Sequence, residues 1–334
     1  MEEPRLGGRR RVLLVGLGTI ARTHREALAA DASIEIVGGV DPSPAQQDVV
    51  PLFRDLDQAF AAGVDPDLVV VATPTRTHLD IVSDVLDRCD ALILSEKPLA
   101  TSVSGIRQLE RSHGRDRVAS RVRVAHHFAF SPDVEWARAV VQQNPGWGKP
   151  SHILCVFNDA YSGLSEEQRA SYVSSWVDSG PNQLSVAAAF ATGWHVVAHS
   201  EEGDRAMTTL DHDGGVTVLA SNWLAADTSK QTAIRFDHVG VEVRVDHTSM
   251  TALVLSSGRP VEHLGYTGSA GRKAAQYLGL YRALRDDPAD HRLSVDLAAS
   301  IAGLLEGAAH RSAEVLGSWA STAEVQTASA LSRG

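Results

Sequence analysis

The chain contains little of what holds small secreted or metal-binding domains together. Only 2 of its 334 residues are cysteine, and Cys89 and Cys155 are too far apart for the spacing of a zinc or redox motif. We expect both thiols to serve as small apolar side chains, as is common in a reducing compartment. Neither thiol is therefore assigned a catalytic or metal-binding role.

The sequence also has no excess of positive charge and no long apolar run. Lys and Arg number 31 against 41 Asp and Glu, for a formal net charge of −10. This balance argues against nucleic acid as a partner, because phosphate backbones are bound by clustered cations. No apolar run approaches membrane-spanning length, and the run after Arg9, Arg10 and Arg11 is too short for an export signal. We expect a cytoplasmic protein with no membrane partner.

What the chain has instead is room for two domains and a regular alternation of strand and helix over its first 124 residues. Near-continuous apolar runs separated by amphipathic segments are typical of a parallel sheet with helices on both faces. The predicted fold class is α/β, with an N-terminal Rossmann-type, doubly wound domain over residues 1–124. The strand runs are Val12–Val15, Ile34–Val40, Leu68–Ala72, Ala91–Leu94 and Val122–Ala125, and helices are predicted over Ile20–Ala30, Thr77–Arg88 and Val103–Ser112.

Residues 125–334 follow a different pattern. A helix is predicted over 133–143, followed by longer strands such as Val241–Asp246, in which apolar and polar residues alternate. This period of two suits a sheet with one buried face, and a last helix is predicted over 295–309. We predict a second, α+β domain with an open, largely antiparallel sheet, which binds the substrate and forms oligomers.

A glycine turn joins the first predicted strand to the first predicted helix. Gly16 permits a tight turn and Gly18 allows the backbone N–H groups of Thr19 and Ile20 to approach a pyrophosphate. Ala21 takes the third position of the motif, where alanine substitutes for glycine. The N-terminus of the following helix favours negative charge. The turn is therefore predicted to bind a dinucleotide.

Asp41 ends the second strand, where a ribose-binding acid is expected. Its carboxylate can accept hydrogen bonds from a 2′-hydroxyl and would repel a 2′-phosphate by about 1–4 kcal/mol. We therefore predict NAD as cofactor, with NADP less favoured. The carboxylate could also cap a helix that opens at Pro42, and the two roles are compatible.

Glu96, Lys97 and Pro98 follow the fourth apolar run. The carboxyl end of a strand in an open parallel sheet is where ligands bind, so Lys97 could reach both a nicotinamide ring and a substrate oxygen. Its ammonium group could stabilise charge that grows on this oxygen. Pro98 would fix the exit of the strand, and a cis peptide bond is one way to do so.

Together these motifs resemble the glucose–fructose oxidoreductase / inositol dehydrogenase (Gfo/Idh/MocA) family. The resemblance implies an NAD(P)-dependent oxidoreductase that transfers hydride between nicotinamide and a ring carbon of a sugar, sugar nucleotide or cyclitol. It also implies a dimer or tetramer formed through the second-domain sheet, and places Thr73, Pro74, His78, Glu96 and Lys97 at the cofactor. The matching segments are Val15–Ala21, Val71–His78, Ser95–Ala100 and, less well, Asp178–Asn182.

The chain departs from this family at its usual catalytic histidine. Asp178 matches the aspartate of the family motif, but Asn182 stands four residues later, where the histidine is expected. A neutral amide can hold a substrate hydroxyl but cannot carry a proton. The proton carrier could be Asp178, Lys97 or Tyr172, the last because the resemblance suggests a tyrosine in some ketoreductases.

Two further residues are candidate substrate ligands. His127 takes the place of a family asparagine in the segment before Pro132, and Tyr161 lies in the predicted loop before Asp178. Adjacent His126 and His127 would point to opposite faces of a strand, so we predict no metal there. Packing within the loop is the alternative role for Tyr161 and Tyr172.

Three kinds of function agree with these patterns. The first is an NAD-dependent sugar or polyol dehydrogenase or ketoreductase. The second is an enzyme that uses tightly bound NAD transiently, for elimination or epimerisation. The third is a non-catalytic dinucleotide-binding regulatory protein, which Asn182 favours. The resemblance favours the first, and the other two are its alternatives.

Overall fold

The computed structural model describes residues 9–43, 51–165, 168–169 and 173–311. The chain divides into two compact units, Met1–His126 with Tyr277–Ala302, and His127–Gln276 with Gly303–Gly334. The predicted division into 1–124 and 125–334 placed residues 277–302 in the second domain. The structure instead groups this segment with the first unit.

The first unit is built on a six-stranded sheet in the order β3-β2-β1-β4-β5-β6. All of its neighbouring strands pair in parallel, which confirms the predicted doubly wound sheet. Its central strands are buried on both faces because their residues are almost all apolar. The strands are β1 (Arg10–Val15), β2 (Ile34–Val40), β3 (Leu52–Phe53), β4 (Leu68–Val71), β5 (Leu92–Glu96) and β6 (Val122–Ala125).

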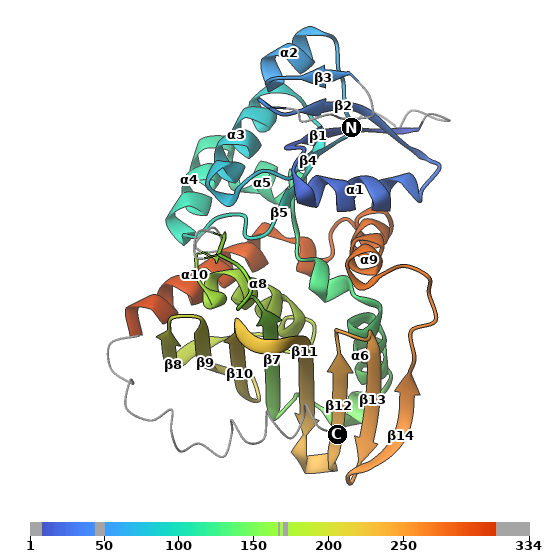
Figure 1. Ribbon diagram of the computed structural model, residues 1–334, viewed down its shortest axis with the longest axis vertical. Helices are drawn as coiled ribbons and strands as arrows, with labels where there is room; N and C mark the ends of the chain where they lie inside the picture. The colour runs from blue at the N-terminus through green and yellow to red at the C-terminus, as the bar shows by residue number, and fades with distance from the viewer. Residues whose placement is uncertain (1–8, 44–50, 166–167, 170–172, 312–334) are drawn as a thin grey trace. The chain divides into compact units, whose positions relative to one another are not determined.

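Helices lie on both sides of this sheet (Figure 1). Local signals fix their ends: Asp55 caps α2 through Gln58 N–H and Ser102 caps α4 through Gly105 N–H, while Gly114, with a φ of +86°, ends α4. The helices are α1 (Thr19–Ala29), α2 (Leu56–Ala61), α3 (His78–Arg88), α4 (Val103–His113) and α5 (Arg115–Arg121), with parts of α9 (Arg272–Asp286) and α10 (Val295–Arg311).

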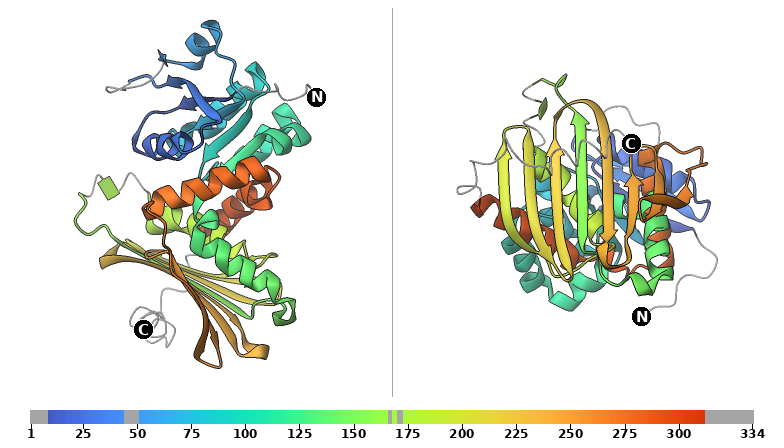
Figure 2. Two further views of the ribbon diagram at one scale, coloured as in Figure 1. Left: turned by 90° about the vertical axis from the view of Figure 1, so that its right-hand side faces the viewer. Right: turned by 90° about the horizontal axis from the view of Figure 1, so that it is seen from below.

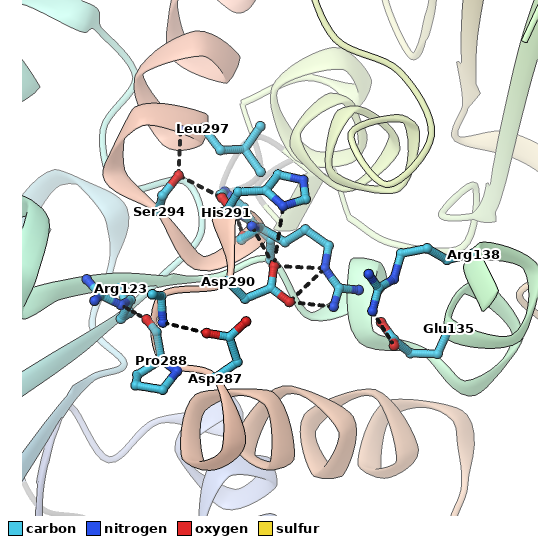
Figure 3. A network of polar contacts seen from close by, with 12 residues as sticks. Arg123, Glu135, Arg138, Asp287, Pro288, Asp290, His291, Ser294 and Leu297 are labelled. Carbon is cyan, nitrogen blue, oxygen red and sulfur yellow. Dashed lines mark hydrogen bonds and ion pairs between the residues drawn. The ribbon is translucent and has the colours of Figure 1, made fainter. Parts of the chain in front are cut away.

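The C-terminal segment 277–302 completes the first unit through both polar and apolar contacts. Arg123 of β6 donates to the Pro288 carbonyl (Figure 3). Within the segment, Asp290 holds the buried guanidinium of Arg292 at 2.6 Å. The start of α10 adds Val295 and three alanines to the apolar core of the unit. The segment is thus held in the first unit by hydrogen bonds and by buried apolar side chains.

His126 at the end of β6 makes this segment sensitive to acid. Its Nδ1 lies 2.9 Å from the Arg292 carbonyl, and burial lowers the pKa of the imidazole from 6.5 to about 4. The unfolded chain therefore binds more protons between these values, so stability should fall by about 3 kcal/mol as the pH drops from 6.5 to 4. Chemical unfolding at several pH values should show this loss in the native chain and a smaller loss in a His126→Gln variant. The exposed His263 of the strand Arg259–Leu264 provides the control. His263→Gln should leave the pH dependence of stability unchanged, and equal slopes in all three proteins would contradict the assignment to His126.

The second unit is built on an eight-stranded sheet in the order β14-β13-β12-β11-β7-β10-β9-β8. Only β7 and β10 pair in parallel, so the predicted open, largely antiparallel sheet is confirmed. The helices α6 (Pro132–Gln143) and α8 (Ser175–Ala187) pack on one face, and Figure 2 shows the other face, which no helix covers among the described residues of this unit. The strands are β7 (His152–Ala160), β8 (His195–Glu202), β9 (Arg205–His212), β10 (Gly215–Asn222), β11 (Leu224–Phe236), β12 (Val241–Asp246), β13 (Thr251–Ser256) and β14 (Arg259–Leu264).

The alternation of burial explains how this sheet holds its register. In β7, Ile153, Cys155, Phe157 and Asp159 are buried and the residues between them are less so. A shift by one residue would turn these side chains to the other face.

Across the part of the chain that the structure describes, no helix is long and apolar enough to cross a membrane.

Candidate functional site

The glycine turn after β1 leaves room for a pyrophosphate. Gly16 has a φ of +86°, and a Cβ there would lie 2.7 Å from both the Ala72 carbonyl oxygen and Thr73 Cγ2, so only glycine fits. Gly18 precedes α1, no side chain caps this helix, and a Cβ on Gly18 would meet no atom within 4 Å. The N-terminus of α1 thus offers both open space and backbone N–H donors at the positive end of the helix dipole. A phosphate needs both.

The carboxylate of Asp41 is fixed at the mouth of this turn. One oxygen accepts the Leu17 N–H at 2.9 Å, and the other accepts the Ser43 N–H at 2.9 Å. The first bond ties the end of β2 to the glycine turn, so the acid lies beside the candidate phosphate site. This is the arrangement that a ribose-binding acid needs. A helix opening at Pro42 would extend into residues 44–50, which lie outside the described part of the chain.

Removal of this charge should relax the choice of cofactor. An Asp41→Asn variant keeps a side-chain oxygen for the Leu17 N–H but no longer repels a 2′-phosphate. We expect the ratio of Kd for NADP to Kd for NAD to fall by about fivefold or more, since like charges at this range cost about 1–4 kcal/mol. Titration calorimetry with both dinucleotides measures this ratio. Asp67→Asn on the same sheet is the control, and an unchanged ratio for Asp41→Asn would contradict the assigned role.

The ends of β4 and β5 are joined by a buried histidine. His78 is 1% exposed, and its ring nitrogens lie 2.8 Å from the Thr73 carbonyl and 2.9 Å from the Pro98 carbonyl. The Thr77 hydroxyl donates to Thr73 Oγ1 at 2.9 Å. His78 therefore supports the backbone of both loops.

Lys97 directly follows β5, at the carboxyl end of the strand beside β4. It is partly buried, its backbone N–H donates to a Glu96 side-chain oxygen at 3.2 Å, and the peptide bond to Pro98 is cis. Glu96 itself is 6% exposed and is held by His24 and Tyr277. Sequence reasoning missed both of these partners.

In the second unit, α8 carries Asp178 and Asn182 one turn apart. The helix begins at Ser175, because Ser174 Oγ accepts the Val177 N–H at 3.2 Å; the predicted loop over 159–177 is therefore shorter than expected. Asn182 is 7% exposed, and its amide nitrogen lies 3.4 Å from the Asp178 carbonyl. Its side-chain oxygen is buried and meets no donor within the described residues, which suits a group that accepts from a ligand hydroxyl.

A buried ion pair lies in the same unit and was not anticipated. Lys230 of β11 donates to Asp159 of β7 at 2.7 Å, with both side chains less than a tenth exposed. The ammonium also lies 5.0 Å from the centre of the Phe157 ring. Burial lowers the pKa of Lys230, while the charges of Asp159 and Asp178 act to raise it. The influence of Asp178 places this pair close to the predicted substrate residues.

The remaining predicted substrate residues are packed to different extents. His127 is buried at the start of a short helix, His127–Phe130, with its ring centre 5.1 Å from that of Phe128. Tyr161 donates its backbone N–H to the Trp223 carbonyl, and the two rings are 5.6 Å apart; this contact agrees with a packing role. Tyr172 lies outside the described residues.

Metal and thiol chemistry find no support in the described ranges. No group of three or more His, Cys, Asp or Glu there could hold a metal ion. Burial raises the pKa of Cys155 to about 12, so its thiol is inert at neutral pH.

The parallel sheet, the glycine turn and the acid beside it define a dinucleotide-binding domain of Rossmann type. Residues 10–123 match the family described as GFO_IDH_MocA, oxidoreductase family, NAD-binding Rossmann fold. The match covers the parallel-sheet domain alone, about a third of the chain. The predicted family resemblance and the predicted NAD cofactor are thereby confirmed.

Two curated relatives match parts of the chain. Inositol 2-dehydrogenase of Rhizobium meliloti (strain 1021) is 31% identical over 99 residues, which are 28% of this chain and 29% of that protein. The rhizopine catabolism protein MocA of Rhizobium meliloti is 28% identical over 133 residues, 38% of this chain and 41% of that protein. The matches thus span less than half of each relative.

Solved structures resemble nearly the whole fold at low sequence identity. Levoglucosan dehydrogenase in complex with NADH and levoglucosan gives a TM-score of 0.76 at 15% identity, over 91% of this chain and 97% of that chain. GenD2 from gentamicin A biosynthesis, in complex with NAD, gives 0.74 at 19% identity, over 94% and 97%. A myo-inositol dehydrogenase from Corynebacterium glutamicum gives 0.72 at 17%, over 91% and 96%. These likenesses show the fold.

Proposed function

We propose that this protein is an NAD-dependent dehydrogenase or ketoreductase acting on a ring carbon of a sugar, sugar nucleotide or cyclitol. The observation that carries the proposal is Lys97 at the carboxyl end of β5, on the same sheet as the dinucleotide turn. A cation at this place suits an oxygen that gains negative charge. The curated relative named inositol 2-dehydrogenase supports the substrate class.

Each residue then has a distinct role. Nicotinamide, when bound, supplies the acceptor or donor of hydride. Lys97 orients and polarises the reacting oxygen, while Asp178 and Asn182 bind neighbouring hydroxyls and His127 contacts the substrate. Asn182 cannot move a proton, so the proton passes to Asp178, to Lys97 or to Tyr172. Single substitutions of these three, with pH–rate profiles, distinguish them.

The proposal is tested by adding NAD and a panel of sugars, sugar nucleotides and cyclitols to the purified protein and following NADH absorbance. We expect NADH to form with at least one ring compound, and more slowly with NADP. Clear NAD binding with no hydride exchange across the panel would favour a regulatory protein. Conversion of a sugar without net NADH, by protein that carries partly reduced NAD, would favour elimination or epimerisation.

We also propose that copies of the chain associate through the helix-free face of the second-unit sheet. The exposed apolar side chains of this sheet include Val261 on β14 and Val197 on β8, and exposed apolar surface favours contact with another chain. Sedimentation of the purified protein should show a dimer or tetramer.

A further inference from the structure

A buried polar cluster in the first unit surrounds the residue before Lys97. It consists of His24 from α1, Glu96 from β5, and Tyr277 and Tyr281 from α9. His24 and Tyr277 are fully buried, and the other two are at most 8% exposed. We call these four residues the His24 cluster. No sequence motif links them, since 257 positions separate His24 from Tyr281.

The bonds in this cluster converge on the carboxylate of Glu96. Its Oε1 lies 2.5 Å from the Tyr277 hydroxyl and 3.0 Å from Nε2 of His24. Its Oε2 accepts the backbone N–H of Lys97 at 3.2 Å. The other ring nitrogen of His24 lies 2.7 Å from the Tyr281 hydroxyl. One oxygen of the carboxylate is therefore anchored in the core, and the other engages Lys97.

The chemistry of these groups sets the direction of each bond. An ionised carboxylate only accepts, so a neutral His24 donates from Nε2 and accepts the Tyr281 O–H at Nδ1. Burial, and then the charge of Glu96, raise the pKa of Tyr277 well above its usual value, so this phenol stays a donor. The buried Glu96 thus receives charge-assisted bonds, which are shorter and stronger than neutral ones.

We propose that His24 and Tyr277 are positioning residues for Lys97. They fix the carboxylate of Glu96, and through its second oxygen they fix the peptide from which the Lys97 side chain extends. His24 also lies on α1, five residues after Thr19 at the phosphate turn, so one cluster aligns the cofactor helix with the lysine strand. The inference rests on the proposed role of Lys97 and goes beyond it, because neither positioning residue touches substrate.

The alternative is that the cluster only satisfies buried polar groups. The two roles separate in a matched pair of variants, Tyr277→Phe and Tyr281→Phe. Both lose one phenol hydroxyl from the same cluster on the same helix, but only the first removes a bond to Glu96. We expect Tyr277→Phe to lower kcat by about 10- to 100-fold, the worth of a bond to a charged group, with KM and the Kd for NAD within about threefold of the native values. Tyr281→Phe should keep kcat within about threefold.

A second pair tests rescue at His24. His24→Gln can still donate an N–H toward Glu96, whereas His24→Leu cannot. We expect His24→Leu to lower kcat about as much as Tyr277→Phe, and His24→Gln to recover at least about half of the loss on a logarithmic scale. Equal kcat in Tyr277→Phe and Tyr281→Phe, or a loss that appears only as weaker NAD binding, would overturn the proposal.

A readout without turnover separates this inference from the proposed function. The rate at which an amine-reactive acylating reagent labels Lys97 is measured against pH by mass spectrometry, with exposed Lys149 as the internal reference. Tyr277→Phe and His24→Leu should shift the labelling rate of Lys97 by at least about threefold, and Tyr281→Phe should not. This shift in a protein with no turnover would support positioning while the proposed function fails. Identical profiles in all variants would overturn the positioning role.

Discussion

Replacement of Lys97 by alanine should lower kcat by about 10²–10⁴-fold while NAD binding stays nearly intact. We expect a fall in kcat of this size because the variant loses a group that orients the reacting oxygen and stabilises its charge. NAD affinity should change little, because the glycine turn and Asp41, which we propose hold the phosphates and ribose, are built by other strand ends. Steady-state kinetics on a substrate from the panel, with calorimetry for NAD, separates the two quantities.

Lys149→Ala is the matched control, since this lysine is largely exposed and pairs only loosely with Asp213 at 3.9 Å. Its kcat should equal that of the native protein. Full turnover in Lys97→Ala would refute the mechanism outright. A loss of kcat that follows loss of NAD binding would make Lys97 a cofactor ligand and no more.

The second large effect is expected on stability. Asp159→Asn should destabilise the protein by about 3–5 kcal/mol, because it leaves the Lys230 ammonium buried without its counter-charge. The double variant Asp159→Leu/Lys230→Met should recover most of this loss, since the pair lies beside the rings of Phe128 and Phe157 and apolar groups of similar volume suit such a site. Urea unfolding measures both free energies.

The exposed pair of Arg115 and Asp296, 3.4 Å apart and more than half exposed on both sides, is the control for this prediction. Asp296→Asn should cost no more than about 1 kcal/mol, as surface pairs and helix-end charges usually do. If Asp159→Asn costs as little as Asp296→Asn, Lys230 has found water or another partner, and the buried pair is not a unit. Catalytic measurements on the double variant would also show whether Lys230 affects substrate turnover.

Local signals explain why the first sheet could be predicted. Five of its six strands contain a short, mostly apolar run, and only the two-residue strand β3 (Leu52–Phe53) was not predicted. The turn after β1 carries a motif in which geometry demands glycine at Gly16. Lys97 was found for the same reason, since its neighbours Glu96 and Pro98 stand beside it in the chain. Features that depend on residues close together in the chain can be predicted from the sequence.

Contacts between distant segments could not be found in this way. Lys230 and Asp159 are 71 positions apart and meet only because β11 and β7 pair in one register, which no local pattern specifies. Helix α9 did leave a signal: Tyr277, Leu280, Tyr281 and Leu284 follow the i, i+3, i+4, i+7 spacing of a buried helical face. That spacing would have predicted the helix, though not its contact with Glu96.

The discontinuous first unit has a consequence for how the protein is made. The last apolar side chains of its core, Val295, Ala298 and Ala302, emerge from the ribosome some 170 residues after β6, once the whole insert 127–276 has been synthesised. Domains generally fold as units, the N-terminal one first, but the first unit of this chain lacks part of its core until residue 302 has been synthesised. During that interval its sheet lacks the segment that holds Glu96 and Arg123, and the insert can complete its own sheet first. On the ribosome, the second-unit sheet, β7 to β14, can therefore form before the first unit has all of its core.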